Sequence, residues 1–116
     1  MLDYKFADYF PDIEKVKAQL RVSFTDDDDD IQDKTEIALE GVATYLNRNV
    51  YPIGATIPDE DSETGIHFNK AIKGGVMLFV TDLYYNRTIS LDQTANENSA
   101  FKLLLDPWRN LAVRMV

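Results

Sequence analysis

The feature that most constrains the fold is a long helical pattern over residues 68–87, in which polar side chains are scarce. One stripe at helical spacing is made of Ile72, Gly75, Phe79 and Leu83. A neighbouring stripe is made of Ala71, Leu78, Asp82 and Tyr85. Such recurrence indicates a helix with an apolar face. Because the apolar arc is wide, we expect this helix to lie at the centre of the molecule, covered on several sides.

A Gly74–Gly75 pair lies inside this pattern. Two glycines within a helix cost roughly 2 kcal/mol relative to two alanines. Close approach of another backbone is the usual compensation, and the alternative is a helix that tolerates the pair, with a kink. We favour close packing, because an apolar run flanks the pair.

The rest of the chain predicts three further helices. They are expected over residues 11–21, from about 29 to 48, and from 99 to 105, where an Asp-Pro pair breaks the last of them. Asn47 and Asn49 suit the end of the second helix, because Asn tolerates the left-handed conformation.

We therefore predict an all-α fold in a single domain, residues 1–116: a compact bundle of about four helices, two long and two short. Two long loops, 50–66 and 88–98, and an N-terminal arm over residues 1–9 complete it. The first loop holds two prolines and two glycines, which exclude regular structure through most of it, and we expect it to be exposed. The arm has no helix start signal, so we expect it to be extended.

Composition excludes several classes of protein. The chain has no cysteine, so it has no disulfide framework and no thiolate metal site. It begins without an apolar signal segment, and its longest apolar run, residues 76–80, is too short to span a membrane. Its net charge of −8 argues against a nucleic-acid-binding surface, which needs clustered Lys and Arg.

Residues 26–30 are five consecutive carboxylates. An EF-hand loop needs Gly at its sixth position and Glu at its twelfth, and no frame through this run supplies both. We therefore interpret the run as a helix N-terminus, where carboxylates accept backbone N–H bonds and offset the helix dipole.

No residue pattern indicates catalysis. The one histidine, His67, has no orienting partner that the sequence identifies. Glu36 and Asp82 are single carboxylates on helices, which are more often solvated or paired than catalytic. No nucleotide-binding, metalloprotease or hydrolase motif is present. We expect neither an enzyme nor a cofactor.

The first half of the chain carries three motifs in order: Ile13-Glu-Lys-Val-Lys-Ala-Gln-Leu-Arg-Val22, then the Asp run, then a helix that ends in Tyr45-Leu-Asn-Arg48. This order resembles the start of the small head–tail connector proteins of tailed bacteriophages. In that family a short helix ends in Leu-Arg, an Asp-rich turn follows, and the next helix carries an aromatic residue before a short polar tail.

The second half resembles the same family. Its motifs are Lys70-Ala-Ile-Lys73, Val80-Thr-Asp-Leu-Tyr-Tyr-Asn-Arg87 and Phe101-Lys-Leu-Leu-Leu-Asp-Pro-Trp-Arg109. The resemblance spans roughly residues 11–112, and its specificity comes from the order and spacing of motifs that are each common. The departures are the Gly74–Gly75 pair, Trp108 where the family usually has Tyr, and a longer arm.

The resemblance implies a structural virion protein, a head-completion adaptor often grouped with DNA packaging. Such a protein assembles in the host cytoplasm as a homo-oligomeric ring, with a dodecamer as one candidate, beneath the portal at the head–tail junction. The ring would extend the DNA channel and dock the next connector or a tail-completion protein. Duplex DNA would pass without sequence-specific binding, and no membrane would be involved.

A ring of head-to-tail contacts needs two different surfaces on each copy. Apolar groups near the two chain ends are the candidates: Leu2, Tyr4, Phe6, Tyr9, Phe10, Trp108, Leu111 and Val113. Two acidic segments suit a channel that must not grip phosphates, although they suit solubility equally well: Asp26, Asp27, Asp28, Asp59, Glu60 and Asp61.

A second hypothesis is a small acidic helical interaction or regulatory module, for example an inhibitor that mimics DNA. The size of the protein in solution separates the two hypotheses. A large ring supports the connector hypothesis, whereas a stable monomer or dimer leaves the second hypothesis open.

Overall fold

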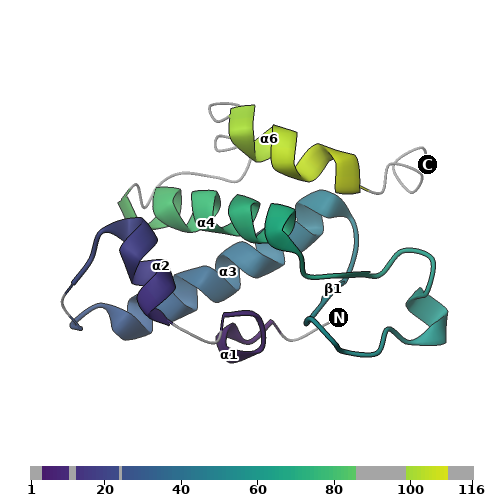
Figure 1. Ribbon diagram of the computed structural model, residues 1–116, viewed down its shortest axis with the longest axis horizontal. Coiled ribbons are helices and arrows are strands. Elements are labelled where there is room, and N and C mark those ends of the chain that lie inside the picture. Colours follow the sequence, from purple (N-terminus) through teal and green to yellow (C-terminus); the bar gives the residue numbers. More distant parts are fainter. Residues whose placement is uncertain (1–3, 11–12, 24, 86–98, 110–116) are drawn as a thin grey trace.

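The computed structural model describes residues 4–10, 13–23, 25–85 and 99–109 (Figure 1). Within them the fold is all-α, as predicted, with one short helix more than expected. The α-helices are α1 (Phe6–Tyr9), α2 (Ile13–Leu20), α3 (Asp28–Leu46), α4 (Lys70–Tyr85) and α6 (Ser99–Leu105). The shorter elements are β1 (Val50–Tyr51), η1 (Asp59–Asp61), β2 (Ile66–His67) and η2 (Asp106–Trp108). The predicted loop 88–98 lies outside the described residues.

Helix α4 is the central element, as its sequence predicted. It contacts α2, α3 and α6, and Figure 1 shows it lying between α3 and α6. Ile72, Gly75 and Phe79 of the predicted stripe are buried, together with Val76 and Val80, while Leu83 is partly buried.

The Gly74–Gly75 pair is where α6 packs closely against α4. A Cβ on Gly75 would lie 2.8 Å from the Cγ and both Cδ atoms of Leu105, and one on Gly74 would lie 2.9 Å from Leu104 Cδ1. Real Cβ atoms essentially never approach another atom so closely. The expected close packing is therefore present, but leucine side chains approach the glycines rather than a second backbone.

Two helices end at a residue in the left-handed conformation. Asn47 has φ 56°, as expected for this helix end, and Arg21 has φ 59°. The N–H groups of Arg48 and Val22 donate to carbonyls five residues back, those of Ala43 and Lys17. Each end is thus a Schellman motif, which satisfies carbonyls that the helix leaves free.

The prediction of an extended, exposed arm is wrong for the described residues of that segment. Tyr4, Phe6, Tyr9 and Phe10 are all buried, and Phe6 and Tyr9 belong to α1. Glu36 on α3 accepts the N–H of Phe6 at 2.6 Å, which holds the start of α1. An apolar aromatic segment that can reach the core buries its rings there, because burial of each ring is strongly favourable.

The loop 50–66 has more regular structure at its ends than the sequence predicted. Strands β1 and β2 pair in parallel, with Ile66 N–H donating to the carbonyl of Asn49 and Phe68 N–H to that of Tyr51. The opposite edge of β1 is covered by the arm: Tyr9 OH donates to the Val50 carbonyl at 2.6 Å, and Val50 N–H donates to Tyr4 OH at 3.3 Å.

The middle of this loop is largely exposed, as expected. The side chain of Ile53 is 75% exposed.

Candidate interaction surfaces

The described C-terminal segment is fastened to the end of α3 by a group that we call the C-terminal clasp: Tyr45, Arg48, Asp106, Trp108 and Arg109. Tyr45 OH donates to Asp106 Oδ1 at 2.5 Å, and Arg48 Nε donates to the Trp108 carbonyl at 2.7 Å. The Arg109 guanidinium lies 4.3 Å from the centre of the Tyr45 ring, in a cation–π contact. These bonds hold η2 against the last turn of α3.

A second group, the Asp-turn clasp, joins the other end of α3 to the end of α4. It consists of Leu20, Asp27, Tyr84 and Tyr85. Tyr84 OH donates to Asp27 Oδ2 at 2.7 Å, and Tyr85 OH donates to the Leu20 carbonyl. The end of α4 is therefore tied both to the turn that precedes α3 and to the end of α2.

A buried lysine strengthens this end of the molecule. Lys17 is only 2% exposed, and its Nζ lies 3.0 Å from Asp28 Oδ1 in the first turn of α3. The contact is an ion pair rather than an aligned hydrogen bond. Replacing Asp28 would leave the buried Lys17 with the exposed Glu14, 3.9 Å away, as its remaining ion-pair partner, which is destabilising.

Two tyrosines in the clasps are held in the neutral form. The hydrogen bond to Asp27, followed by burial, raises the pKa of Tyr84 to about 12. Burial, followed by the hydrogen bond to Asp106, raises the pKa of Tyr45. Each phenol stays a donor to its carboxylate well above neutral pH.

Asp61 organises the acidic segment of the loop 50–66. Its carboxylate accepts hydrogen bonds from Thr64 Oγ1 at 2.6 Å, Tyr51 OH at 2.7 Å and Asn49 Nδ2 at 3.0 Å. The bonds from Thr64 and Tyr51 lower the pKa of Asp61, and the same carboxylate raises the pKa of Tyr51 to about 12. Gly65 passes close by, since a Cβ there would lie 2.8 Å from Asp61 Oδ2.

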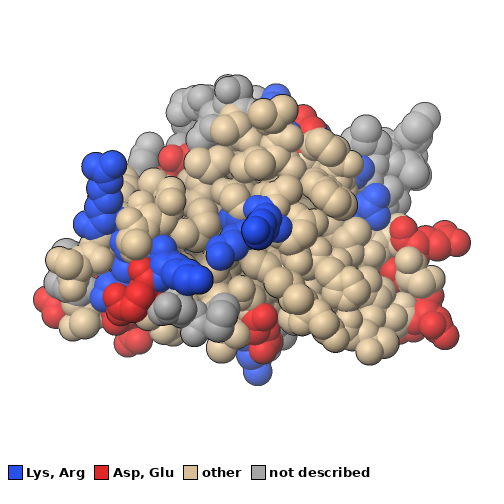
Figure 2. All heavy atoms as spheres, in the orientation of Figure 1, with Lys and Arg blue, Asp and Glu red and all other residues tan. Residues whose placement is uncertain are grey.

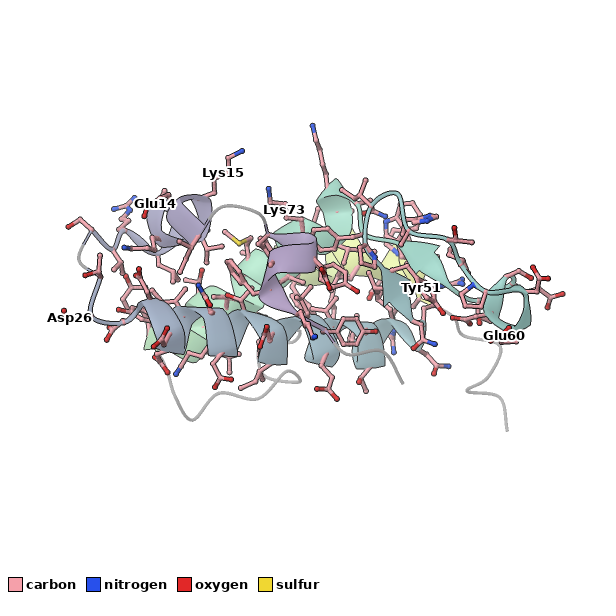
Figure 3. All side chains as sticks on the ribbon, turned by 90° about the horizontal axis from the view of Figure 1, so that it is seen from below. Glu14, Lys15, Asp26, Tyr51, Glu60 and Lys73 are labelled. Carbon is pink, nitrogen blue, oxygen red and sulfur yellow. The ribbon has the colours of Figure 1, made fainter. Side chains whose placement is uncertain are left out.

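The structure does not bring the two predicted acidic segments together. Asp26 and Glu60 lie at opposite ends of the long axis (Figure 3). Asp26, Asp59 and Glu60 are exposed. Asp27, Asp28 and Asp61 are instead engaged in the contacts described above.

The predicted apolar interface residues are not brought together either. Tyr4, Phe6, Tyr9 and Phe10 lie in the core of their own chain, so the expectation that they present apolar surface is wrong. Trp108 is 41% exposed, in keeping with its predicted place at the surface. Leu2, Leu111 and Val113 lie outside the described residues. Contact between this set and a neighbouring subunit stays a prediction.

His67 lies at the surface, and its Nε2 is 2.6 Å from the Ala55 carbonyl. Within the described residues, no three His, Asp or Glu side chains are grouped so that they could hold a metal ion. This includes the described run of aspartates at 26–30.

The clasps bring together the motifs that carry the resemblance to phage connectors. Tyr84 and Tyr85 at the end of α4 contact the Asp run and the Leu20-Arg21 motif. The motif Tyr45-Leu-Asn-Arg48 contacts Asp106-Pro-Trp-Arg109. A comparison with family models matches residues 11–109 to the phage gp6-like head-tail connector proteins. The chain belongs to this family. No curated protein and no solved structure matches the connector in the corresponding searches.

Membership makes the connector a phage structural protein of the head–tail junction. The family is a structural one and is not known for catalysis. Among the described residues, no helix is both long and apolar enough to cross a membrane.

Sequence reasoning missed two surfaces of the connector. Lys15 lines one groove together with Lys70 and Lys73, although it lies far from them in the chain. Ile37 is 51% exposed on α3, on the helix face that also carries Asp33 and Glu40. The signal for Ile37 was present, because it lies on the outer side of the predicted helix, whereas the lysines looked scattered.

Proposed function

We propose that the connector assembles as a homo-oligomeric ring beneath the portal, extends the DNA channel and docks the next connector or tail component. The observation that carries this proposal is the family match over residues 11–109. The compact bundle supports it, because a subunit whose described segments 4–10 and 106–109 are held against its helices can repeat around an axis without rearranging.

The distribution of charge supports self-assembly over mimicry of DNA. A protein that imitates DNA needs a broad acidic surface and has no use for a basic one. Despite its net charge of −8, this chain gathers Lys and Arg side chains over α2 and α4, while Asp and Glu side chains lie mainly toward the edges of the same view (Figure 2). Separate surfaces of opposite charge suit head-to-tail contacts between copies.

The acidic ends suit two positions in a ring. If the long axis of each copy points to the centre, one of the two ends, at Asp26 or at Glu60, lines the channel. If the long axis runs along the channel, the two ends lie at its two mouths. Either arrangement presents carboxylates that repel DNA phosphates, so the duplex slides past without being gripped.

The test is the mass of the assembly, measured by light scattering on the purified chain alone and with the portal protein of its own phage. The proposal expects a ring in at least one of these conditions, visible by electron microscopy with a hole wide enough for duplex DNA. A chain that stays monomeric or dimeric in both conditions, and that does not bind the portal, overturns it.

A further inference from the structure

A groove of about 560 Å³ opens between α2, α4 and α6. Its apolar lining includes Met77, Leu78 and Leu104, and its basic lining is Lys15, Lys70 and Lys73. Figure 2 shows Lys and Arg side chains gathered on this face, over α2 and α4. We call this surface the lysine groove.

The three lysines are available to a partner. Lys15 and Lys70 are exposed, and Lys73 is half-buried. In the described parts of the chain, no carboxylate forms an ion pair with any of them. Lys15 and Lys73 extend from the same side of the molecule (Figure 3), with Glu14 as an acidic neighbour.

The opposite side of the molecule carries a complementary stripe on α3. It consists of Asp29, Asp33, Ile37 and Glu40, whose spacing of three to four residues puts them on one face of the helix. All four are exposed, and Ile37 stands between the carboxylates with half of its surface in solvent. In Figure 3, acidic side chains extend from α3 toward the edge opposite Lys15 and Lys73. We call this surface the α3 stripe.

We propose that the lysine groove of one copy receives the α3 stripe of the next copy. The inference rests on the proposed ring and names its subunit contact. Ile37 would lie on the apolar floor near Met77, Leu78 and Leu104, while the carboxylates face the lysines. The two surfaces are complementary. The α3 stripe has a protruding apolar side chain flanked by carboxylates, and the lysine groove has an apolar floor flanked by lysines.

The positions of the two surfaces suit a closed ring. They face in opposite directions along the shortest axis of the molecule, where the Cα atoms span 20 Å. Copies joined through opposite faces stack side by side, and a small rotation at each contact closes a ring of many members. Two surfaces on adjacent faces would close after only a few copies.

A pair of charge-reversed chains tests this contact. The groove-reversed chain is Lys15→Glu/Lys73→Glu, and the stripe-reversed chain is Asp33→Lys/Glu40→Lys. Each alone juxtaposes like charges, so its association should weaken by about tenfold or more. Mixed in equal amounts, each chain offers the surface that the other needs, and assembly should return as alternating copies. Lys102→Glu and Glu63→Lys, exposed charges outside both surfaces, are the matched controls.

The mass of the assembly is measured for each chain and for the mixture. The measurement is made with or without the portal protein, in whichever condition the unmodified chain assembles. Loss in each reversed chain with recovery in the mixture supports the contact. If both reversed chains assemble like the controls, or if the mixture does not recover, the contact is wrong and the ring stands. If the unmodified chain does not assemble in either condition, both the proposed ring and the proposed contact are wrong.

The absence of cysteine from the chain allows a second, geometric readout. Ile37→Cys mixed with Met77→Cys should give a disulfide-linked dimer under mild oxidation. Ile53→Cys mixed with Met77→Cys is the control, because Ile53 is exposed in the loop 50–66. A yield no higher than that of the control contradicts the proposed contact even if charge reversal disrupts assembly.

Discussion

Asp61 shows how one side chain organises a segment that the sequence predicted to be irregular. It collects hydrogen bonds from Asn49, Tyr51 and Thr64, and so ties β1 to the turn that follows η1. The acidic residues beside it, Asp59 and Glu60, are exposed. Three consecutive acidic residues therefore differ in role: Asp61 organises the loop, whereas Asp59 and Glu60 lie at the surface.

Asp61→Asn tests this role through pH. The pKa of Asp61 in the folded chain lies below its ordinary value of 3.8, so its charge stabilises the fold above about pH 4. That contribution is lost as the pH falls through the folded-state pKa. Asp61→Asn should lower the free energy of unfolding by about 1 kcal/mol at neutral pH, with a difference that shrinks in acid. Chemical denaturation across pH measures it, with Asp59→Asn as control. An equal loss at every pH contradicts this account.

The tyrosines predict an alkaline transition. The pKa values of Tyr51 and Tyr84 are raised to about 12, and burial raises those of Tyr4 and Tyr9. Groups with raised folded-state pKa values stabilise the fold fully below the unfolded value of 10, and this stability is lost as the pH rises toward 12.

Phenolate absorbance during an alkaline titration reports this directly. The folded chain should ionise most of its six tyrosines late, and the denatured chain should ionise them together near pH 10. Tyr84→Phe removes one late-titrating group and serves as the assignment control. Indistinguishable titrations of the folded and denatured chains would refute the described hydrogen bonds.

At the scale of elements, the contact between α4 and α6 depends on the glycine pair. Gly75→Ala gains about 1 kcal/mol of helix propensity but forces a methyl group against the fully buried Leu105. Overpacking of this kind costs about 1–3 kcal/mol, so we expect net destabilisation. Gly74→Ala gains the same propensity and meets only the tip of the partly buried Leu104, so it should cost less.

Thermal or chemical unfolding of both variants makes the comparison. Leu105→Ala should remove the penalty of Gly75→Ala in a double-mutant cycle, since it removes the atoms that clash. If Gly75→Ala stabilises the chain as much as Gly74→Ala, α6 does not pack against α4 as described.

Residues 4–10, the described part of the arm and the adjoining Phe10, are part of the fold. Phe10 is 3% exposed and contacts Phe6 and Phe68 through its ring. Phe10→Ala should therefore lower the free energy of unfolding by about 3 kcal/mol or more. Trp108→Ala, which truncates a half-exposed ring, should cost clearly less. Chemical denaturation of the two variants measures both free energies of unfolding. A negligible effect of Phe10→Ala would contradict the buried position of this segment and favour an exposed arm.

Periodicity was sufficient to predict the long helices, because a central helix such as α4 must be apolar over a wide arc. The close packing at Gly75 could also be predicted, but its partner could not, since nothing local points to Leu105. The arm was mispredicted because the edge of β1 that Tyr4 and Tyr9 cover exists only after residues 50 and 66 have paired. Lys15 and Lys73 looked scattered because packing, rather than sequence, brings α2 beside α4.

At the scale of the whole molecule, the bundle is fastened at both ends of α3. The Asp-turn clasp and the C-terminal clasp use the motifs that the family match covers, so those motifs maintain the subunit. For assembly we propose the lysine groove and the α3 stripe, which face in opposite directions. The proposed ring follows from repeating that one contact around an axis.

Electron cryomicroscopy of the connector assembled on its portal tests this most directly. We expect copies related by rotation around a hole wide enough for duplex DNA, with α3 of each copy lying against α2, α4 and α6 of the next. A ring held together by exchanged arms or by the chain ends, with α3 facing solvent, would contradict it.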